Sequence, residues 1–199
     1  MIPVSPQSEP AQFNSTVRQK GLAYLHKRGL ALDKPLPPGT TIESYWRSSL
    51  DDLYRSYQGT CAYLAVYFDR GIGAASVDHF VAKSSLPGLA YEWSNYRLAC
   101  LAMNSRKNSF DDLLDPFTLE IGWFHLELLQ GRIFPNPHLT STQQEQVQKS
   151  IKRLGLDDPL YNALRRGHYQ DYINGDYTER YLQKISPFVW MEAQRQGLL

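Results

Sequence analysis

Hydrophobic residues return at helical spacing through the first third of the chain. After a polar, proline-bearing arm, this spacing predicts a helix from about Ser15 to Lys27 that ends at Gly29. Several prolines then interrupt the pattern before Thr41, which can cap a second helix running to Gly59. The apolar face of this second helix consists of Ile42, Trp46, Leu50, Leu53 and Tyr57.

From Cys61 to Phe80 the pattern changes to residues that favour β-strands. Two runs of such residues flank a turn at residues 69–73, and this arrangement predicts a β-hairpin. Ser94 or Asn95 can then cap a helix that runs to about Lys107. The middle of the chain is therefore predicted to follow the order strand, strand, helix.

The last third is predicted to hold a second, smaller hairpin followed by helices. Weak alternation from Thr118 to Phe134 predicts the hairpin, and helices are predicted over 141–154, 159–172 and 178–196. We therefore expect an α+β fold, mainly helical and forming a single domain. Its expected parts are an N-terminal arm and helix (1–40), a strand–strand–helix core with its leading helix (41–116), and the hairpin and C-terminal helices packed on that core (117–199).

Composition indicates a folded protein, but the net charge does not by itself indicate a charged partner such as nucleic acid. Of the 199 residues 42% are hydrophobic and 13% aromatic, and the formal net charge is only +1. The best basic segment runs from Arg70 to Lys107, where five Lys and Arg residues stand against Asp78 and Glu92, a surplus of +3. Such a surplus fits either a nucleic-acid contact or an ordinary solvated face.

Targeting signals and membrane spans are not expected. The N-terminal residues lack the pattern of a signal peptide, and no apolar run approaches the length needed to cross a bilayer. We therefore expect a cytoplasmic protein without membrane partners, in which Cys61 and Cys100 are reduced.

Acid, imidazole, amide and amine groups are concentrated between Asp78 and Lys107. Hydrolysis of a phosphodiester needs an activated water, neutralisation of the developing charge, and help for the leaving oxygen. The imidazole of His79 has an ordinary pKa near neutrality, which suits a general base. Asp78 and Asn104 offer oxygens of the kind that hard divalent cations prefer, and Lys107 is placed to hold a phosphate.

These residues stand in the order of the HNH endonuclease, or ββα-metal, motif, which the segment resembles. The residues that carry the resemblance are Val77-Asp78-His79-Phe80, Asn95 and Asn104-Ser105-Arg106-Lys107. The resemblance implies a metal-dependent nuclease that acts on DNA. In it, His79 is the general base, Asp78 and Asn104 bind Mg²⁺ or Mn²⁺, and Asn95 orients the loop. The residues expected to contact phosphate are Lys107, Arg106, Arg97 and Lys83.

Many HNH proteins also carry two Cys-x-x-Cys pairs that bind a structural zinc, and this chain keeps half of each pair. The corresponding segments read Cys61-Ala62-Tyr63-Leu64 and Cys100-Leu101-Ala102-Met103. Two thiols cannot complete a tetrahedral zinc site. We therefore expect no structural zinc, with Cys61 and Cys100 as relics and with Leu64 and Met103 packed in place of the missing ligands.

Over Trp46 to Asp115 the chain resembles the small HNH proteins of bacterial anti-phage systems, notably the PtuB-like component of Septu and related retron systems. This resemblance rests on Thr60-Cys61-Ala62-Tyr63 and on 93–100 as well as on the motif. It implies a role as a defence effector that works beside an ATPase partner.

Less specific interpretations of the same residues stay open. The alternative function is a degenerate HNH fold that binds nucleic acid or a partner subunit without hydrolysis. Asn95 could serve only as a helix cap, and Asn104 could simply face solvent. The remaining histidines lack ligand spacing and are interpreted as structural or surface groups: His26, His125, His138 and His168.

Overall fold

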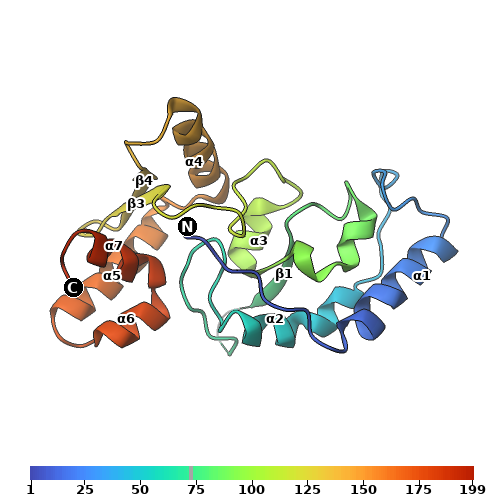
Figure 1. Ribbon diagram of the computed structural model, residues 1–199, viewed down its shortest axis with the longest axis horizontal. Helices are drawn as coiled ribbons and strands as arrows, with labels where there is room; N and C mark the ends of the chain where they lie inside the picture. The colour runs from blue at the N-terminus through green and yellow to red at the C-terminus, as the bar shows by residue number, and fades with distance from the viewer. Residues whose placement is uncertain (72–73) are drawn as a thin grey trace. The chain divides into compact units, whose positions relative to one another are not determined.

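The computed structural model describes residues 1–71 and 74–199. In this part of the chain seven α-helices accompany two small antiparallel sheets, so the fold is mixed α and β (Figure 1). Two compact units are distinguished, each assembled from segments that are not consecutive. The β1–β2 unit comprises 6–59 and 70–112, and the β3–β4 unit comprises 1–5, 60–69 and 113–199. The division at 40 and 116 stays a prediction from the sequence.

The first predicted helix is confirmed. A π-helical turn, η1 (Asn14–Arg18), continues directly into α1 (Gln19–Lys27). The helix ends where Gly29 adopts a φ of +63°, a left-handed conformation that favours glycine. Gly21 is needed for another reason, because a Cβ atom there would lie 2.1 Å from a ring carbon of Tyr91. The helix therefore packs closely against an aromatic ring of the same unit.

The second predicted helix begins later than expected. Residues 41–44 are not helical, and a 3₁₀ turn, η2 (Tyr45–Ser49), leads into α2 (Leu50–Ser56). The prediction of a cap at Thr41 is therefore wrong. Two adjacent threonines and Ile42 are β-branched, and such residues lose side-chain freedom in a helix. Trp46 and Leu53 are buried, as the helical spacing predicted.

The predicted hairpin over residues 61–80 is wrong in its first half. Residues 61–66 are buried without alternation and form a turn, in which the Ala65 N–H donates to the Cys61 carbonyl (2.8 Å). Ala65 adopts a φ of +52°, which bends the chain. The strand-favouring residues of this segment are therefore buried core residues outside any strand. Ile72 and Gly73, from the predicted turn, lie outside the described residues.

The strand β1 (Ala75–His79) instead pairs antiparallel with β2 (Tyr96–Cys100), placing Asp78 opposite Arg97. The intervening loop contains two 3₁₀ turns, η3 (Pro87–Tyr91) and η4 (Trp93–Asn95). The predicted helix from 95 to 107 therefore begins only at α3 (Leu101–Lys107), which packs on both strands. Pairing with β1 overrode the weak helical pattern of residues 96–100. The predicted order strand, strand, helix is present, but its strands are β1 and β2 and not the two strands of the predicted hairpin.

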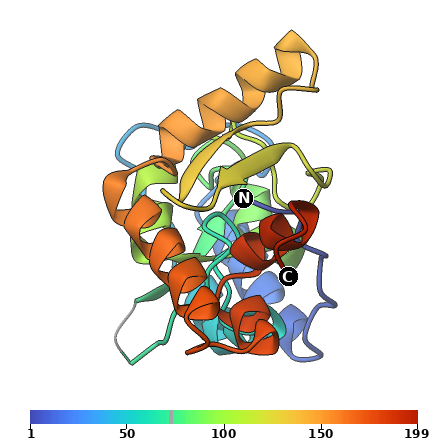
Figure 2. The ribbon, with the colours of Figure 1, turned by 90° about the vertical axis from the view of Figure 1, so that its left-hand side faces the viewer.

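The β3–β4 unit contains the second hairpin at the predicted place. β3 (Phe124–Glu127) pairs with β4 (Arg132–Pro135), with Leu126 opposite Ile133. Figure 2 shows this hairpin in yellow, followed by the long helix α4 (Ser141–Leu154), which contacts β4. The Thr140 side chain accepts from the Gln143 N–H and begins the helix with a capping box.

The C-terminal helices are α5 (Pro159–Ile173), α6 (Glu179–Ile185) and α7 (Pro187–Arg195). The sequence predicted one helix over 178–196, and this prediction is wrong at one point. Ser186 leaves the helical conformation (φ −145°, ψ 66°) because the following proline disfavours it there. Leu182, Phe188 and Val189 are buried in the unit's core. No helix within the described residues is long and apolar enough to cross a membrane.

Candidate active site

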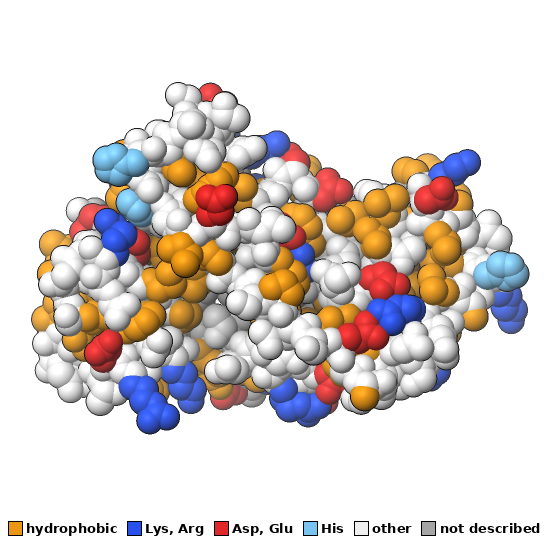
Figure 3. All heavy atoms as spheres, in the orientation of Figure 1, with side chains coloured by type: hydrophobic (Ala, Val, Ile, Leu, Met, Phe, Trp, Pro, Cys, Tyr) orange, Lys and Arg blue, Asp and Glu red, His pale blue; other side chains and the backbone are white. Residues whose placement is uncertain are grey.

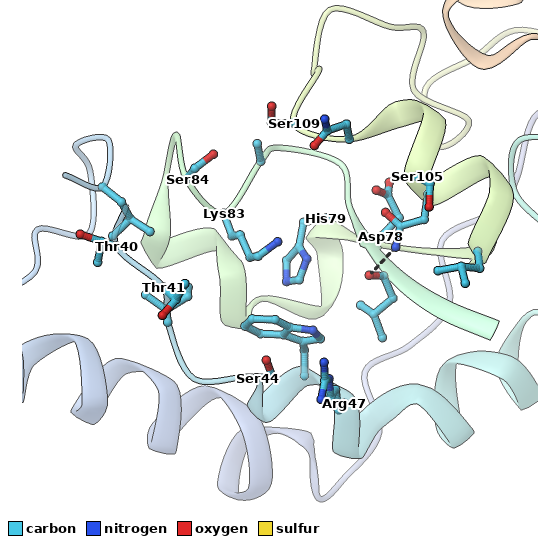
Figure 4. A pocket seen from close by; sticks show the side chains of 18 residues that line it. Thr40, Thr41, Ser44, Arg47, Asp78, His79, Lys83, Ser84, Ser105 and Ser109 are labelled. Carbon is cyan, nitrogen blue, oxygen red and sulfur yellow. Dashed lines mark hydrogen bonds between the residues drawn. The ribbon is translucent and has the colours of Figure 1, made fainter. Parts of the chain in front are cut away.

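A cavity of about 600 Å³ opens beside the end of β1, entirely within the β1–β2 unit. Asp78 and His79 reach it from β1, and Asn104 lines it from α3. Arg47 enters from η2 and Lys83 from the loop after β1. In the view of Figure 4, His79 lies between Lys83 and Asp78. The cavity therefore brings together three residues that the sequence predicted as site residues, one predicted cation, and one cation that it did not predict.

The imidazole of His79 is held in one orientation by its neighbours. Its Nε2 lies 3.0 Å from the Ala90 carbonyl oxygen, which also accepts from the Tyr96 hydroxyl (2.8 Å). The ring meets Trp46 edge to face, with centroids 4.7 Å apart, and the ring of Tyr96 at 5.2 Å. A carbonyl oxygen can only accept, so we assign the hydrogen of the neutral ring to Nε2. Nδ1 then carries the lone pair that can accept a proton.

Burial controls the charge of His79. The side chain is 6% exposed, and desolvation lowers its pKa from 6.5 to about 3, aided by the nearby ammonium groups of Lys83 and Lys107. The ring is therefore neutral at neutral pH, which is the state in which it can accept a proton. A phosphate bound nearby adds negative charge, and this raises the pKa of the imidazole again.

Asn95 is buried, does not belong to the described lining of the cavity, and fixes the loop between β1 and β2. Its side-chain oxygen accepts from the Val81 N–H (2.8 Å), and its amide nitrogen donates to the carbonyls of Val81 and Leu89 (both 3.0 Å). Leu89 directly precedes Ala90, whose carbonyl contacts His79. Asn95 therefore acts on His79 through the backbone, which is the geometry expected of a residue that orients the loop.

Asp78 shares its buried position with Lys107. The two side chains are almost fully buried, and the Lys107 Nζ lies 3.5 Å from Oδ1 of Asp78. The same ammonium donates to the His79 carbonyl oxygen (2.8 Å). Burial lowers the pKa of Lys107, and the Asp78 carboxylate opposes that shift. The ammonium expected to hold a phosphate therefore points into the protein, where it joins α3 to the end of β1.

Asn104 belongs to α3, lines the cavity and contacts β1. Its Nδ2 donates to the Val77 carbonyl at 3.4 Å, a long hydrogen bond, so its oxygen lies at the other end of the amide. A carboxylate from Asp78 and an amide oxygen from Asn104 suit a hard cation such as Mg²⁺, which keeps several waters and binds few protein ligands. Among the described residues no group of three or more His, Cys, Asp and Glu side chains could hold a metal ion. A magnesium site at Asp78 and Asn104 stays a prediction.

The other predicted phosphate contacts are distributed unequally. Arg97 is 3% exposed, and its Nη1 donates to the carbonyls of Ser94 (2.8 Å) and Tyr96 (3.0 Å). Neither Arg97 nor the half-buried Arg106 belongs to the described lining of the cavity. Lys83 does, with its Nζ 5.7 Å from the centre of the Trp46 ring. Only one of the four predicted cations therefore reaches the cavity.

Arg47 is the cavity residue that sequence reasoning missed. It is exposed on η2 and lines the same cavity as His79. The basic segment considered in the sequence began at Arg70, and no spacing along the chain links Arg47 to the Asp-His pair. Its position beside Trp46, on a predicted helix, gave no signal beyond that of an ordinary surface arginine.

The two cysteines are both free and belong to different units. Cys61 is buried in the turn at 61–66 of the β3–β4 unit, and Cys100 ends β2 as the residue before α3. Leu64 and Met103 are both buried, as expected for apolar replacements of zinc ligands. The interpretation of the cysteines as relics stays a prediction.

Comparison with known proteins leaves the family open. No family model matches the chain, and no curated protein matches it. Acidic and basic side chains are interspersed on the face shown in Figure 3, in agreement with the net charge of +1. Any functional interpretation must therefore rest on the local chemistry of the cavity.

Proposed function

We propose that this protein is a metal-dependent endonuclease of the HNH type that hydrolyses phosphodiester bonds in DNA. The observation that carries the proposal is that a carboxylate, an imidazole and an amide from β1 and α3 line one cavity: Asp78, His79 and Asn104. The same three residues carried the resemblance to the HNH motif. A role as effector of a bacterial anti-phage system, beside an ATPase partner, is the biological setting that the resemblance favours.

In the proposed reaction one residue of the chain, His79, takes the proton from water. Water attacks phosphorus, and its proton passes to Nδ1 of His79, whose Nε2–H stays on the Ala90 carbonyl. The phosphorus–oxygen bond to the leaving group breaks, and that oxygen takes a proton from solvent. Asn95 keeps the imidazole aimed by holding the loop at Val81 and Leu89. His79 then releases its extra proton to solvent and returns to the neutral state, whereas Asn95 takes no part in the proton transfers.

Asp78 and Asn104 are the residues that would hold Mg²⁺ or Mn²⁺. When bound, such an ion neutralises charge that develops on the phosphoryl oxygens. Lys107 acts on this site indirectly, because its ammonium pairs with the Asp78 carboxylate and donates to the backbone carbonyl of His79.

Cleavage of supercoiled plasmid in Mg²⁺ or Mn²⁺ tests the proposal. We expect His79→Ala to slow cleavage by roughly 10²- to 10⁴-fold, the usual contribution of a general base. His26→Ala, a change at an exposed histidine of the same unit, should cleave at the rate of the native chain. Equal cleavage by the native chain and His79→Ala would refute the catalytic assignment.

One observation favours a second candidate, a DNA-binding or complex-forming subunit that does not hydrolyse. The Asp78 carboxylate already has an ammonium partner in Lys107, and that cation competes with a metal for the same oxygens. Duplex binding by the native chain, together with no cleavage in either metal, would favour this candidate over the nuclease.

A further inference from the structure

Two exposed cations line the cavity and have no anionic partner. Arg47 and Lys83 stand on separate segments, and within residues 1–71 and 74–199 no hydrogen bond or ion pair engages either charged group. Lys83 has only the ring of Trp46 beneath its ammonium. By contrast, the buried side chains of Lys107 and Arg97 donate to backbone carbonyls inside the protein. Cations that point into a cavity without a partner favour an anionic ligand.

The charge balance around the cavity agrees with this. Its described lining contains one carboxylate, that of Asp78, and Lys107 offsets this charge from the buried side. The charges of Arg47 and Lys83 are therefore left over. A second hollow that Arg47 also borders adds one cation, Lys20, and one carboxylate, Glu43, and so adds no further net charge. The excess positive charge is thus local, although the whole chain carries only +1.

We propose that Arg47 and Lys83 are the phosphate-binding pair of this cavity and hold the backbone of duplex DNA against His79. This inference rests on the proposed nuclease function and replaces Lys107, Arg97 and Arg106 as phosphate contacts. In Figure 4 the Lys83 side chain extends beside His79, and Arg47 approaches from η2. The hydroxyl groups of Ser44, Ser84 and Ser105 supply further donors along the lining.

The contact is with the backbone and carries no base information. Trp46, the aromatic residue of the lining, is 9% exposed and packs against His79, with Tyr91 at 5.9 Å between ring centroids. Its face is covered by Lys83, so it offers no platform for a base. Phosphate contacts by Arg and Lys fix position without reading sequence. Affinity is therefore expected to be the same for duplexes of different sequence.

The salt dependence of DNA binding measures this pair directly. Each phosphate neutralised by a cation contributes about 0.9 to the slope of log affinity against log salt concentration. Fluorescence anisotropy with a short fluorescein-labelled duplex, in EDTA, gives this slope for the full chain without cleavage. We expect Arg47→Gln and Lys83→Gln each to lower the slope by about 0.9, and the double variant to lower it by about twice that.

Matched controls and competing outcomes decide the inference. Lys27→Gln and Arg28→Gln remove the same charges from exposed positions at the end of α1 and should leave the slope unchanged. Circular dichroism of each variant verifies folding. Unchanged slopes for Arg47→Gln and Lys83→Gln, a slope lowered by Arg106→Gln alone, or no duplex binding by the native chain would each overturn the inference.

The His79→Ala variant separates this inference from the proposed function. Its cleavage rate tests the proposed base, whereas the salt slopes of Arg47→Gln and Lys83→Gln test the two cations. If the native chain showed the Arg47 and Lys83 effects on binding but cleaved no DNA, the proposed catalysis would fail while the phosphate-binding pair stood.

Discussion

The molecule contains two segments with the same local order, an antiparallel strand pair followed by a helix. One is β1–β2–α3 and the other is β3–β4–α4. Each has a buried histidine on its first strand, His79 and His125, and burial lowers the pKa of both imidazoles. The local architecture and the residue type are therefore shared, although only one segment carries a candidate site.

The difference lies in what surrounds each histidine. His79 shares an open cavity with Asp78 and Asn104. Near His125, the Glu192 carboxylate accepts from the Leu126 N–H (2.7 Å) and from the exposed side chain of Arg195, so both of its oxygens already have partners in the protein. A cavity of about 400 Å³ beside β4 does not include His125 in its described lining. A buried histidine thus suggests chemistry where it lines an open cavity together with other polar side chains.

The two helices also differ in what holds them. The capping box of Thr140 and Gln143 begins α4, whereas α3 follows β2 at Cys100, whose side chain forms no capping hydrogen bond. The short helix α3 is instead tied to β1 by the ammonium of Lys107. A lysine in α3 and a lysine in α4 should therefore contribute very differently to stability.

Replacing these lysines tests that difference. Lys107→Met leaves the Asp78 carboxylate buried without its cation, and we expect the free energy of unfolding to fall by about 3–5 kcal/mol. Lys152→Met, at an exposed position on α4, should change it by less than about 0.5 kcal/mol. Urea denaturation gives both values. Similar small losses in the two variants would mean that the buried pair does not hold α3.

The acid dependence of stability compares the two histidines. The folded-state pKa of His79 is about 3, below its ordinary 6.5, so the unfolded chain binds more protons between those values. The contribution of His79 to the free energy of unfolding is therefore complete above pH 6.5. It is lost as the pH falls toward 3, by about 1.4 kcal/mol per pH unit. Between pH 6 and 4, the free energy of unfolding measured in urea should therefore fall less steeply with pH in His79→Gln than in the native chain, by about 1.4 kcal/mol per pH unit.

A variant of the second histidine provides the control. His125→Gln should flatten the same profile less than His79→Gln, because His79 is the histidine whose pKa is lowered as far as about 3. A larger effect from His125→Gln would reverse the comparison and assign the stronger desolvation to the β3–β4 unit.

Metal affinity gives the smallest expected difference between the segments. Asp78→Asn removes the carboxylate of the proposed Mn²⁺ site, and we expect affinity to fall by at least about 10-fold, measured by isothermal titration calorimetry. Asp157→Asn is the matched change, because Asp157 accepts from Arg132 of β4. It should leave Mn²⁺ affinity unchanged. A loss of affinity in Asp157→Asn alone would place the metal outside the proposed site.

The sequence correctly predicted the helices and strands that are determined by residues close together in the chain, such as a helix cap or a terminating glycine. The helix ending at Gly29, the hairpin before Pro135 and the capped helix from Ser141 are found where the sequence placed them. The predictions failed where distant partners decided. Residues 61–66 form a buried turn instead of a strand. Residues 96–100 form a strand instead of a helix because they pair with β1.

The candidate site divides in the same way. The sequence identified Asp78, His79 and Asn104, and the structure places all three around one cavity. It could not identify Arg47, because that residue enters the cavity from a segment with no fixed spacing to the motif. It also could not show that Lys107 and Arg97 point inward, since the direction of a long side chain depends on acceptors that only folding supplies.

The sequence alone thus determined which chemical groups the chain carries and in what order, because residue types and their order are properties of the chain. The tertiary structure decided which of those groups are available. It turned Lys107 and Arg97 toward carbonyl oxygens in the interior and left Arg47 and Lys83 facing the cavity. The physical reason is that a buried cation must find acceptors or lose its hydration without compensation, whereas an exposed one remains free to meet a ligand.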